Sequence, residues 1–149
     1  MKTYFLKSSI WLPAARDRVF SFFADPGNLQ QITPPWLRFT VLGSSTPEIG
    51  PGTLLDYKLR LRGVPLRWQS EISVWEPPLR FVDKQKRGPY RMWIHQHLFT
   101  EKEGGTQVED LVEYAAFGGR LIHRFLIRPD LEKIFAFRGQ ALQTLFRSS

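Results

Sequence analysis

Residues 92–115 read MWIHQHLFTEKEGGTQVEDLVEYA, and this stretch decides the fold. Runs rich in aliphatic and aromatic residues lie on both sides of Gly104-Gly105, and such runs are typical of β-strands. A glycine pair between two runs of this kind is typical of a tight turn. The stretch therefore predicts an antiparallel hairpin.

The register of this hairpin follows from its turn. A four-residue loop over residues 102–105 pairs Glu101 with Thr106 and fixes every earlier pair. One face then holds mainly aromatic residues and histidines, and its facing pairs are Trp93 with Tyr114, His95 with Val112, His97 with Asp110, and Phe99 with Val108. The other face is the more charged one, so we expect the first face to be concave and to point inward.

Outward from the hairpin, the chain supplies further strands. An apolar alternation over residues 3–12 predicts a first strand, and the next segment predicts two short helices, one over residues 14–24 and one from Asp25-Pro26 to about Ile32. Separate strand-like runs, divided by glycine and proline turns, occupy residues 39–42, 54–61, 66–75 and 80–85. Short connections between them indicate antiparallel neighbours.

After Gly118-Gly119 the apolar spacing becomes helical and continues nearly to the end of the chain. Pro129 predicts a kink or a break, and Asp130 would then cap the longer C-terminal part. The whole pattern predicts one α+β domain over residues 1–149. Its curved antiparallel sheet of about six to seven strands surrounds a long C-terminal helix, with two short helices after the first strand and a cavity between sheet and helix.

Composition limits what this domain can do. Its 149 residues include no Cys, which excludes thiolate chemistry, and 14% of them are aromatic. Lys7, Ser8 and Ser9 interrupt the apolar residues near the N-terminus, and no later run is long enough to span a bilayer, so we expect a cytoplasmic protein without an integral membrane segment. The net charge of +7 is spread along the chain, which favours a solvated basic surface. The oligomeric state is left open.

Two more hairpins place side chains on the concave face. Their turns are expected at residues 87–90 and, as a four-residue loop, at residues 62–65. The facing pairs are then Asp83 with His95, Phe81 with His97, Leu59 with Trp68, and Tyr57 with Ser70.

Arg138 interrupts the apolar stripe of the last helix. A guanidinium in such a place needs a buried carboxylate or an anionic group of a ligand. Asp83 and Asp110 are the candidates that the sequence itself offers.

The paired histidines and aspartates allow several interpretations. A histidine oriented by a carboxylate can act as a general acid or base, so His95, His97, Asp83 and Asp110 are candidate catalytic residues. Alternatively, these pairs satisfy polar groups on a cavity wall and orient a bound ligand. The second interpretation is favoured, because neither a nucleophile nor a phosphate-binding loop accompanies the pairs.

Metal and nucleic-acid binding are the remaining alternatives. His95-Gln96-His97 has a spacing that metal ligands use on one face of a strand, with Asp110 as a third ligand. No independent signal supports a metal, so we predict neither a metal nor a cofactor. Nucleic-acid binding would need aromatic and basic residues on one surface, whereas here the aromatic residues are expected inside and the basic residues outside.

The motifs together resemble a known family. They are the helix pair ending at Pro34-Pro35, and the patterns WEPPxxFxD from Trp75, GPYxxWxHxHxF from Gly88, TxxxD from Thr106 and IFxxR from Ile134. Over essentially the whole chain these are similar to the SRPBCC superfamily, the helix-grip fold of START and Bet v 1 proteins. The resemblance extends to its bacterial single-domain members that are described as ligand-binding or polyketide cyclase/dehydrase-like.

The resemblance implies a deep hydrophobic cavity and ligands such as lipids, sterols, polyketides or quinones. We therefore expect a binding protein for a small hydrophobic or amphipathic molecule, with a cyclase or dehydratase as the alternative and nucleic-acid binding as the weakest. Trp68, Trp93, Phe99 and Tyr114 are either pocket wall or ordinary core. The expected ligand-binding residues are Tyr57, Leu59, Trp68, Phe81, Asp83, Trp93, His95, His97, Phe99, Asp110, Tyr114 and Arg138.

Overall fold

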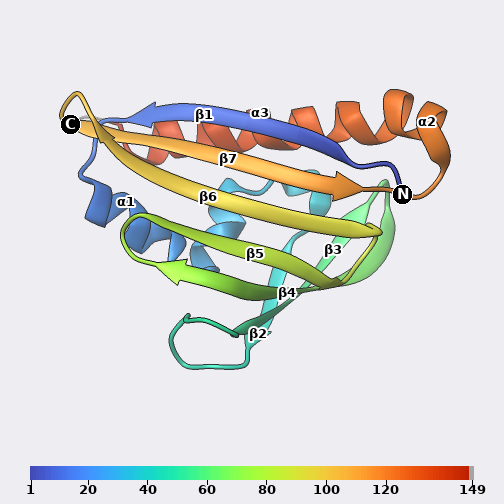
Figure 1. Ribbon diagram of the computed structural model, residues 1–149, viewed down its shortest axis with the longest axis horizontal. Helices are drawn as coiled ribbons and strands as arrows, with labels where there is room; N and C mark the ends of the chain where they lie inside the picture. The colour runs from blue at the N-terminus through green and yellow to red at the C-terminus, as the bar shows by residue number, and fades with distance from the viewer. Residues whose placement is uncertain (148–149) are drawn as a thin grey trace.

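The hairpin of residues 92–115 lies within a seven-stranded antiparallel sheet that curves around a long helix (Figure 1). The computed structural model describes residues 1–147. The strands, in the order β1-β7-β6-β5-β4-β3-β2 across the sheet, are β1 (Tyr4–Leu12), β7 (Gly105–Ala115), β6 (Met92–Lys102), β5 (Arg80–Arg87), β4 (Val64–Glu76), β3 (Leu54–Leu61) and β2 (Thr40–Ser44). The predicted α+β helix-grip fold is confirmed.

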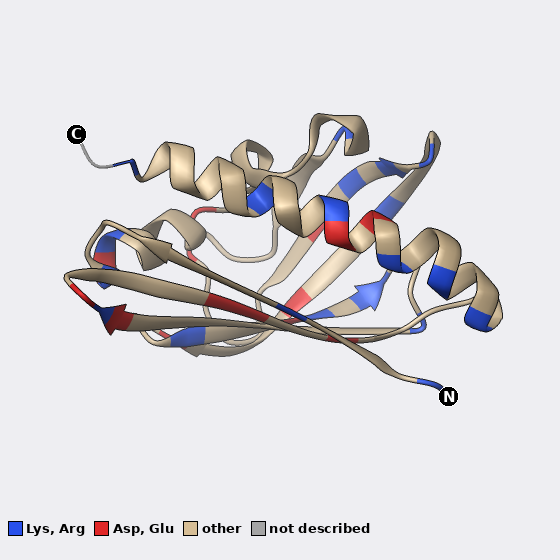
Figure 2. Cartoon of the chain, turned by 90° about the horizontal axis from the view of Figure 1, so that it is seen from above, with Lys and Arg blue, Asp and Glu red and all other residues tan. Residues whose placement is uncertain are grey.

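Helices cover one face of this sheet. In Figure 2, α3 (Arg128–Leu145) extends along the concave side of the strands. The two short helices expected after the first strand are α1 (Arg16–Phe23) and the 3₁₀ helix η1 (Pro26–Ile32), which the Asp25 carboxylate caps by accepting a hydrogen bond from the Gly27 N–H. A further 3₁₀ turn, η2 (Pro35–Leu37), leads into β2. None of the described helices is long and apolar enough to cross a membrane.

The register predicted for the β6–β7 hairpin is correct. Glu101 pairs with Thr106, and the pairs His95 with Val112 and His97 with Asp110 follow. The turn itself is tighter than expected, because Glu103 and Gly104 have φ of 49° and 75° and form a two-residue turn. The β5–β6 register is also as predicted, with Asp83 opposite His95 and Phe81 opposite His97.

The predicted register of the β3–β4 hairpin is wrong by two residues. Arg62 and Gly63, with φ of 49° and 80°, form a two-residue turn in place of a four-residue loop. The facing pairs are therefore Tyr57 with Trp68, Leu59 with Leu66, and Leu61 with Val64. Because side chains alternate with a period of two, this shift leaves every side chain on its predicted face.

The last helical region is not broken at Pro129. A short helix α2 (Gly119–Ile122), a π-helical turn η3 (His123–Ile127) and α3 follow one another without a gap. Pro129 has no N–H and cannot donate a hydrogen bond to the carbonyl four residues earlier. The preceding turn is widened, and there the Arg128 N–H donates to the His123 carbonyl, five residues earlier. Asp130 caps nothing: its carboxylate instead binds Arg62 in the β3–β4 turn, at 3.0 and 3.1 Å.

Two apolar clusters fill the space between the sheet and α3. One lies around α1 and the C-terminal end of α3 and includes Phe23, Phe81 and Phe99. The other lies under the N-terminal half of α3 and includes Trp93 and Phe135. The polar residues predicted for the concave face lie between these two clusters.

Candidate functional site

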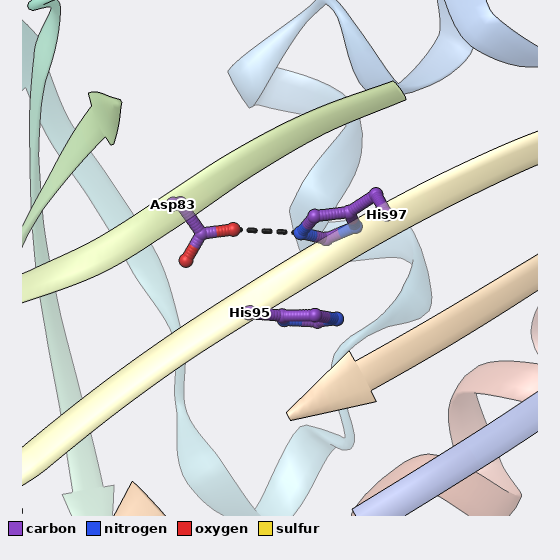
Figure 3. Close-up of side chains that lie close together, drawn as sticks. All are labelled: Asp83, His95 and His97. Carbon is purple, nitrogen blue, oxygen red and sulfur yellow. Dashed lines mark hydrogen bonds and ion pairs between the residues drawn. The ribbon is translucent and has the colours of Figure 1, made fainter. Parts of the chain in front are cut away.

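Five ionisable side chains meet on the concave face, and we call them the polar cluster: Asp83, His95, His97, Asp110 and Arg138. They come from β5, β6, β7 and α3. Strand alternation turns the first four inward, as predicted, and Arg138 reaches them from the helix. His95, His97 and Asp110 are only 7%, 4% and 3% exposed, so the cluster is almost closed to solvent. Figure 3 shows Asp83, His95 and His97 within it.

The predicted pairing inside the cluster is wrong in one respect. Asp83 faces His95 and Asp110 faces His97 across the sheet, but the hydrogen bonds run diagonally. His95 Nε2 lies 2.7 Å from Asp110 Oδ1, and His97 Nε2 lies 2.6 Å from Asp83 Oδ2. Diagonal neighbours are within reach of long side chains on a sheet. His95 therefore faces the carboxylate on β5 but donates to the one on β7, and His97 does the reverse.

The two imidazoles of the cluster also stack on each other. The His95 and His97 rings lie 3.7 Å apart and nearly parallel, and the His97 ring stacks in turn on Phe81 at 4.0 Å. The three rings form a column across the concave face.

Arg138 joins this column to α3. Its Nη2 and Nε lie 3.0 and 3.3 Å from the two oxygens of Asp110, and Nη2 lies 3.4 Å from His97 Nδ1. Asp110 is therefore the carboxylate partner, one of the two that the sequence offered. The guanidinium also lies 5.1 Å from the centre of the Phe23 ring and 5.9 Å from that of Phe135.

The contacts define the charges of the cluster. Burial, and then the neighbouring His95, lower the pKa of His97 to about 4, so His97 is neutral at pH 7. Burial alone would raise the pKa of Asp110, but Arg138 and the His95 hydrogen bond outweigh it and hold this pKa well below its usual range. The pKa of Asp83 is also lowered, because the His97 hydrogen bond outweighs burial.

These protonation states agree with the hydrogen bonds. His97 donates from Nε2 to Asp83, and its bare Nδ1 accepts from Arg138. Within residues 1–147, the only fully buried side-chain nitrogen or oxygen without a hydrogen bond is Nε of Arg16. No fully buried nitrogen or oxygen of the polar cluster is therefore left without a hydrogen bond.

Two nitrogens of the cluster make no hydrogen bond to the described residues: Nδ1 of His95 and Nη1 of Arg138. His95 Nε2 donates to Asp110, so in the neutral tautomer of this ring Nδ1 is the acceptor. Arg138 Nη1 is a donor. The cluster can therefore offer one acceptor and one donor without losing any of its own bonds.

The other predicted ligand-binding residues surround the cluster unevenly. Phe81 contacts His97, and Trp93 lies 6.3 Å from His95, between ring centres. Phe99 packs among the apolar residues beside His97. The pKa of Tyr57 is raised by burial and, to a smaller extent, by the negative charge of Asp83. Trp68, Tyr114 and Leu59 do not touch the cluster: Trp68 packs on Trp93, Tyr114 bonds to His123, and Leu59 lines an outer depression. A ligand-binding role for these residues stays a prediction.

Sequence reasoning missed two residues that hold Arg138. Phe135 lies three residues before it on the same helical stripe, and that spacing was a usable signal. Phe23 comes from α1, and its contact with Arg138 depends on where α1 packs over the sheet. No local sequence pattern predicts where α1 packs over the sheet.

Depressions on the surface lie away from the cluster. One of about 490 Å³ is lined by Arg38, Lys58, Arg60 and Arg67, and one of about 450 Å³ lies between η2, the β3–β4 turn and α3. Neither is lined by any member of the polar cluster. Neither of these depressions therefore opens onto the cluster, and the cavity expected between sheet and α3 stays a prediction.

The geometry of the cluster suits a hydrogen-bonded network better than a metal site. Asp83, His95 and His97 do present ligand atoms within 4.8 Å of one another. A metal ion, however, lies in the plane of each imidazole that binds it, and two stacked rings 3.7 Å apart do not share such a position. The guanidinium of Arg138 next to His97 would also repel a cation.

Comparison with known proteins agrees with the fold. Residues 12–140 match the family described as polyketide cyclase / dehydrase and lipid transport. No curated protein matches the chain.

Solved structures with the same fold are distant in sequence. Ginseng major latex-like protein 151 from Panax ginseng superposes with a TM-score of 0.72 at 12% identity, covering 98% of this chain and 99% of its own. Protein Ms6760 from Mycobacterium smegmatis has a TM-score of 0.70 at 17% identity, covering 97% and 96%. The di-domain ARO/CYC BexL from the BE-7585A biosynthetic pathway has a TM-score of 0.75 at 18% identity, with 99% of this chain covering 51% of BexL.

These likenesses show the fold, and the family match covers most of the chain. The family match supports a role in binding a ligand or in cyclase chemistry. The chain belongs to the polyketide cyclase/dehydrase and lipid transport family of the SRPBCC superfamily.

Proposed function

We propose that the protein binds a small amphipathic molecule between the sheet and α3, and that the polar cluster holds its polar end. One observation carries this proposal: five ionisable side chains, three of them buried and two half-buried, meet on a concave face that is otherwise apolar and rich in aromatic residues. Buried ion pairs are often no more stabilising than apolar residues of the same size, so stability alone does not account for them. A role in recognising a ligand accounts for these ionisable side chains.

The aromatic walls on both sides of the cluster determine the expected ligand. Trp93 and Phe135 lie on one side, and Phe81, Phe99 and Phe23 on the other. A ligand that replaces part of these contacts must itself be largely apolar. Its polar end should contain an acceptor for Arg138 and a donor for His95, which an enol, a phenol or a hydroxyl beside a carbonyl would supply.

A test of this proposal uses the small molecules of the host cell. The purified protein is incubated with an organic extract of the host and separated from free compounds, and any bound molecule is identified by mass spectrometry. We expect one class of amphipathic molecule to be enriched on the wild-type protein. Arg138→Met should lose it, while Lys133→Gln, an exposed change on the same helix, should keep it.

A second candidate function, that of a cyclase or dehydratase, has one specific observation in its favour. His95 donates to the Asp110 carboxylate through Nε2, which leaves Nδ1 as an oriented base. Deprotonation of a carbon next to a ligand carbonyl would need such a base and a donor such as Arg138 for the developing oxyanion. Incubation of the identified molecule with wild type and His95→Gln separates the two functions: turnover by wild type alone supports catalysis, and binding without turnover supports a carrier.

A further inference from the structure

Exposed apolar side chains gather on the segment that precedes α3. We call residues 117–126 the docking segment. Its five large apolar side chains are all exposed, from 37% to 70%: Phe117, Leu121, Ile122, Phe125 and Leu126. Single exposed apolar residues are common on soluble proteins, but a contiguous group of this kind marks an interaction site.

One side chain fastens the docking segment to the sheet. His123 is its only buried residue, with its Nε2 2.7 Å from the Tyr114 hydroxyl and its ring stacked 3.5 Å from that of Tyr4. Gly118 and Gly119, with φ of 97° and 79°, turn the chain sharply out of β7 before the segment. The other side chains of the segment are exposed.

Positive charge surrounds these apolar residues. Arg120 and Arg124 lie within the segment and Arg91 beside it, with the Arg91 guanidinium 4.7 Å from the Phe117 ring centre. Within residues 1–147, no carboxylate lies at ion-pair distance from these three arginines. Lys2, Arg91 and Arg120 also line a depression of about 260 Å³. Figure 2 shows blue and no red at the α2 end of the helix.

We propose that the docking segment binds the surface of an anionic lipid bilayer. Leucine, isoleucine and phenylalanine with interspersed arginines are the composition by which a helix lies in the headgroup region, with apolar side chains among the acyl chains and arginines on the phosphates. A second copy of this chain is a poor occupant, because it would bring two sets of Arg91, Arg120 and Arg124 together. This inference stands on the exposed segment alone and does not rest on the proposed function.

Vesicle sedimentation tests the proposal. We expect the wild-type protein to bind vesicles of equal parts phosphatidylserine and phosphatidylcholine, to bind phosphatidylcholine vesicles much more weakly, and to dissociate as salt is added. Circular dichroism of each variant confirms that it is folded. Vesicle sedimentation does not depend on the polar cluster. A failure to bind vesicles would therefore leave the ligand proposal unaffected.

Two double variants locate the contact. Arg120→Gln with Arg124→Gln should weaken binding about thirtyfold, since each basic residue near an anionic surface contributes about fivefold. Leu121→Ser with Phe125→Ser should weaken it at least about tenfold by removing buried apolar area. The matched controls change exposed residues elsewhere, Lys58→Gln with Arg60→Gln and Val64→Ser with Leu79→Ser, and should bind like wild type.

Three results would overturn the proposal. The first is that wild type does not sediment with phosphatidylserine vesicles. The second is that the control variants lose as much binding as the segment variants. The third is a dimer in solution that the Leu121→Ser, Phe125→Ser variant abolishes, without vesicle binding, which would assign the segment to a second copy.

Discussion

Replacing Asp110 with Asn will destabilise the protein far more than the same change on its surface. Asp110 accepts hydrogen bonds from His95 Nε2 and Arg138 Nη2 on one oxygen and from Arg138 Nε on the other. An Asn amide has one acceptor and one donor end, so one of these donors faces an NH₂ group however the amide is turned. The substitution also leaves the Arg138 guanidinium buried without a carboxylate partner.

The structure sets the size of this effect. The Arg138 side chain is 12% exposed and that of Asp110 is 4% exposed, so solvent screens the pair weakly. Removing one partner of a buried ion pair lowers the free energy of unfolding by about 3 kcal/mol or more. The matched control is Asp130→Asn, which breaks the bidentate contact with Arg62, where the side chains are 36% and 57% exposed. An exposed pair contributes about 1 kcal/mol at most.

Urea unfolding at neutral pH, followed by tryptophan fluorescence and circular dichroism, measures both variants. Arg138→Met and the double variant complete a cycle, and we expect a coupling energy of about 1 to 3 kcal/mol between Asp110 and Arg138. Two results would show that the cluster is not closed and mutually dependent. One is that Asp110→Asn lowers the free energy of unfolding no more than Asp130→Asn does. The other is that the effects of Asp110→Asn and Arg138→Met on this free energy are additive.

Acid will destabilise the protein between about pH 6.5 and pH 4, because the unfolded chain protonates His97 near its usual pKa while the folded pKa is about 4. The loss should be about 3 kcal/mol in urea titrations and smaller in His97→Gln. Gly63→Ala will cost about 1 kcal/mol in thermal unfolding, because φ is 80° there, whereas Gly43→Ala, with open space around it, should cost less. Amides of residues 119–127 should exchange with deuterium faster than those of α3, because His123 is the only buried residue among them.

Each of these outcomes has an opposite that counts against the account. A stability that does not change across the acid range would mean that His97 is not held neutral by its surroundings. Equal costs at Gly63 and Gly43 would contradict the two-residue turn. Equal exchange protection in residues 119–127 and in α3 would show that the π-helical turn is held as firmly as the helix that follows.

Strand periodicity predicted which side chains point inward. Alternation along residues 92–115 placed His95, His97 and Asp110 on the concave face, and this conclusion survived the register error in the β3–β4 hairpin, because a two-residue shift preserves the face. The Arg62-Gly63 turn could have been predicted, since a glycine at the second position suits a two-residue turn with positive φ.

Other features of the site could not be predicted from local sequence patterns. The diagonal hydrogen bonds of His95 and His97 depend on side-chain angles that the strand register does not determine. The contact between Phe23 and Arg138 joins two helices far apart in sequence. Pro129 signalled an irregularity correctly, but whether a helix breaks, kinks or widens there depends on what packs around it.

The proposal that a ligand's polar end contacts the polar cluster is tested most directly by nuclear magnetic resonance of the imidazole nitrogens. The chain has three histidines; His95 and His97 lie in the cluster, and His123 lies in the docking segment and serves as an internal control. As the molecule recovered from the host extract is added, we expect the His95 and His97 signals to shift and saturate together while that of His123 stays in place. Unchanged His95 and His97 signals, with ligand-induced shifts elsewhere in the protein, would contradict it.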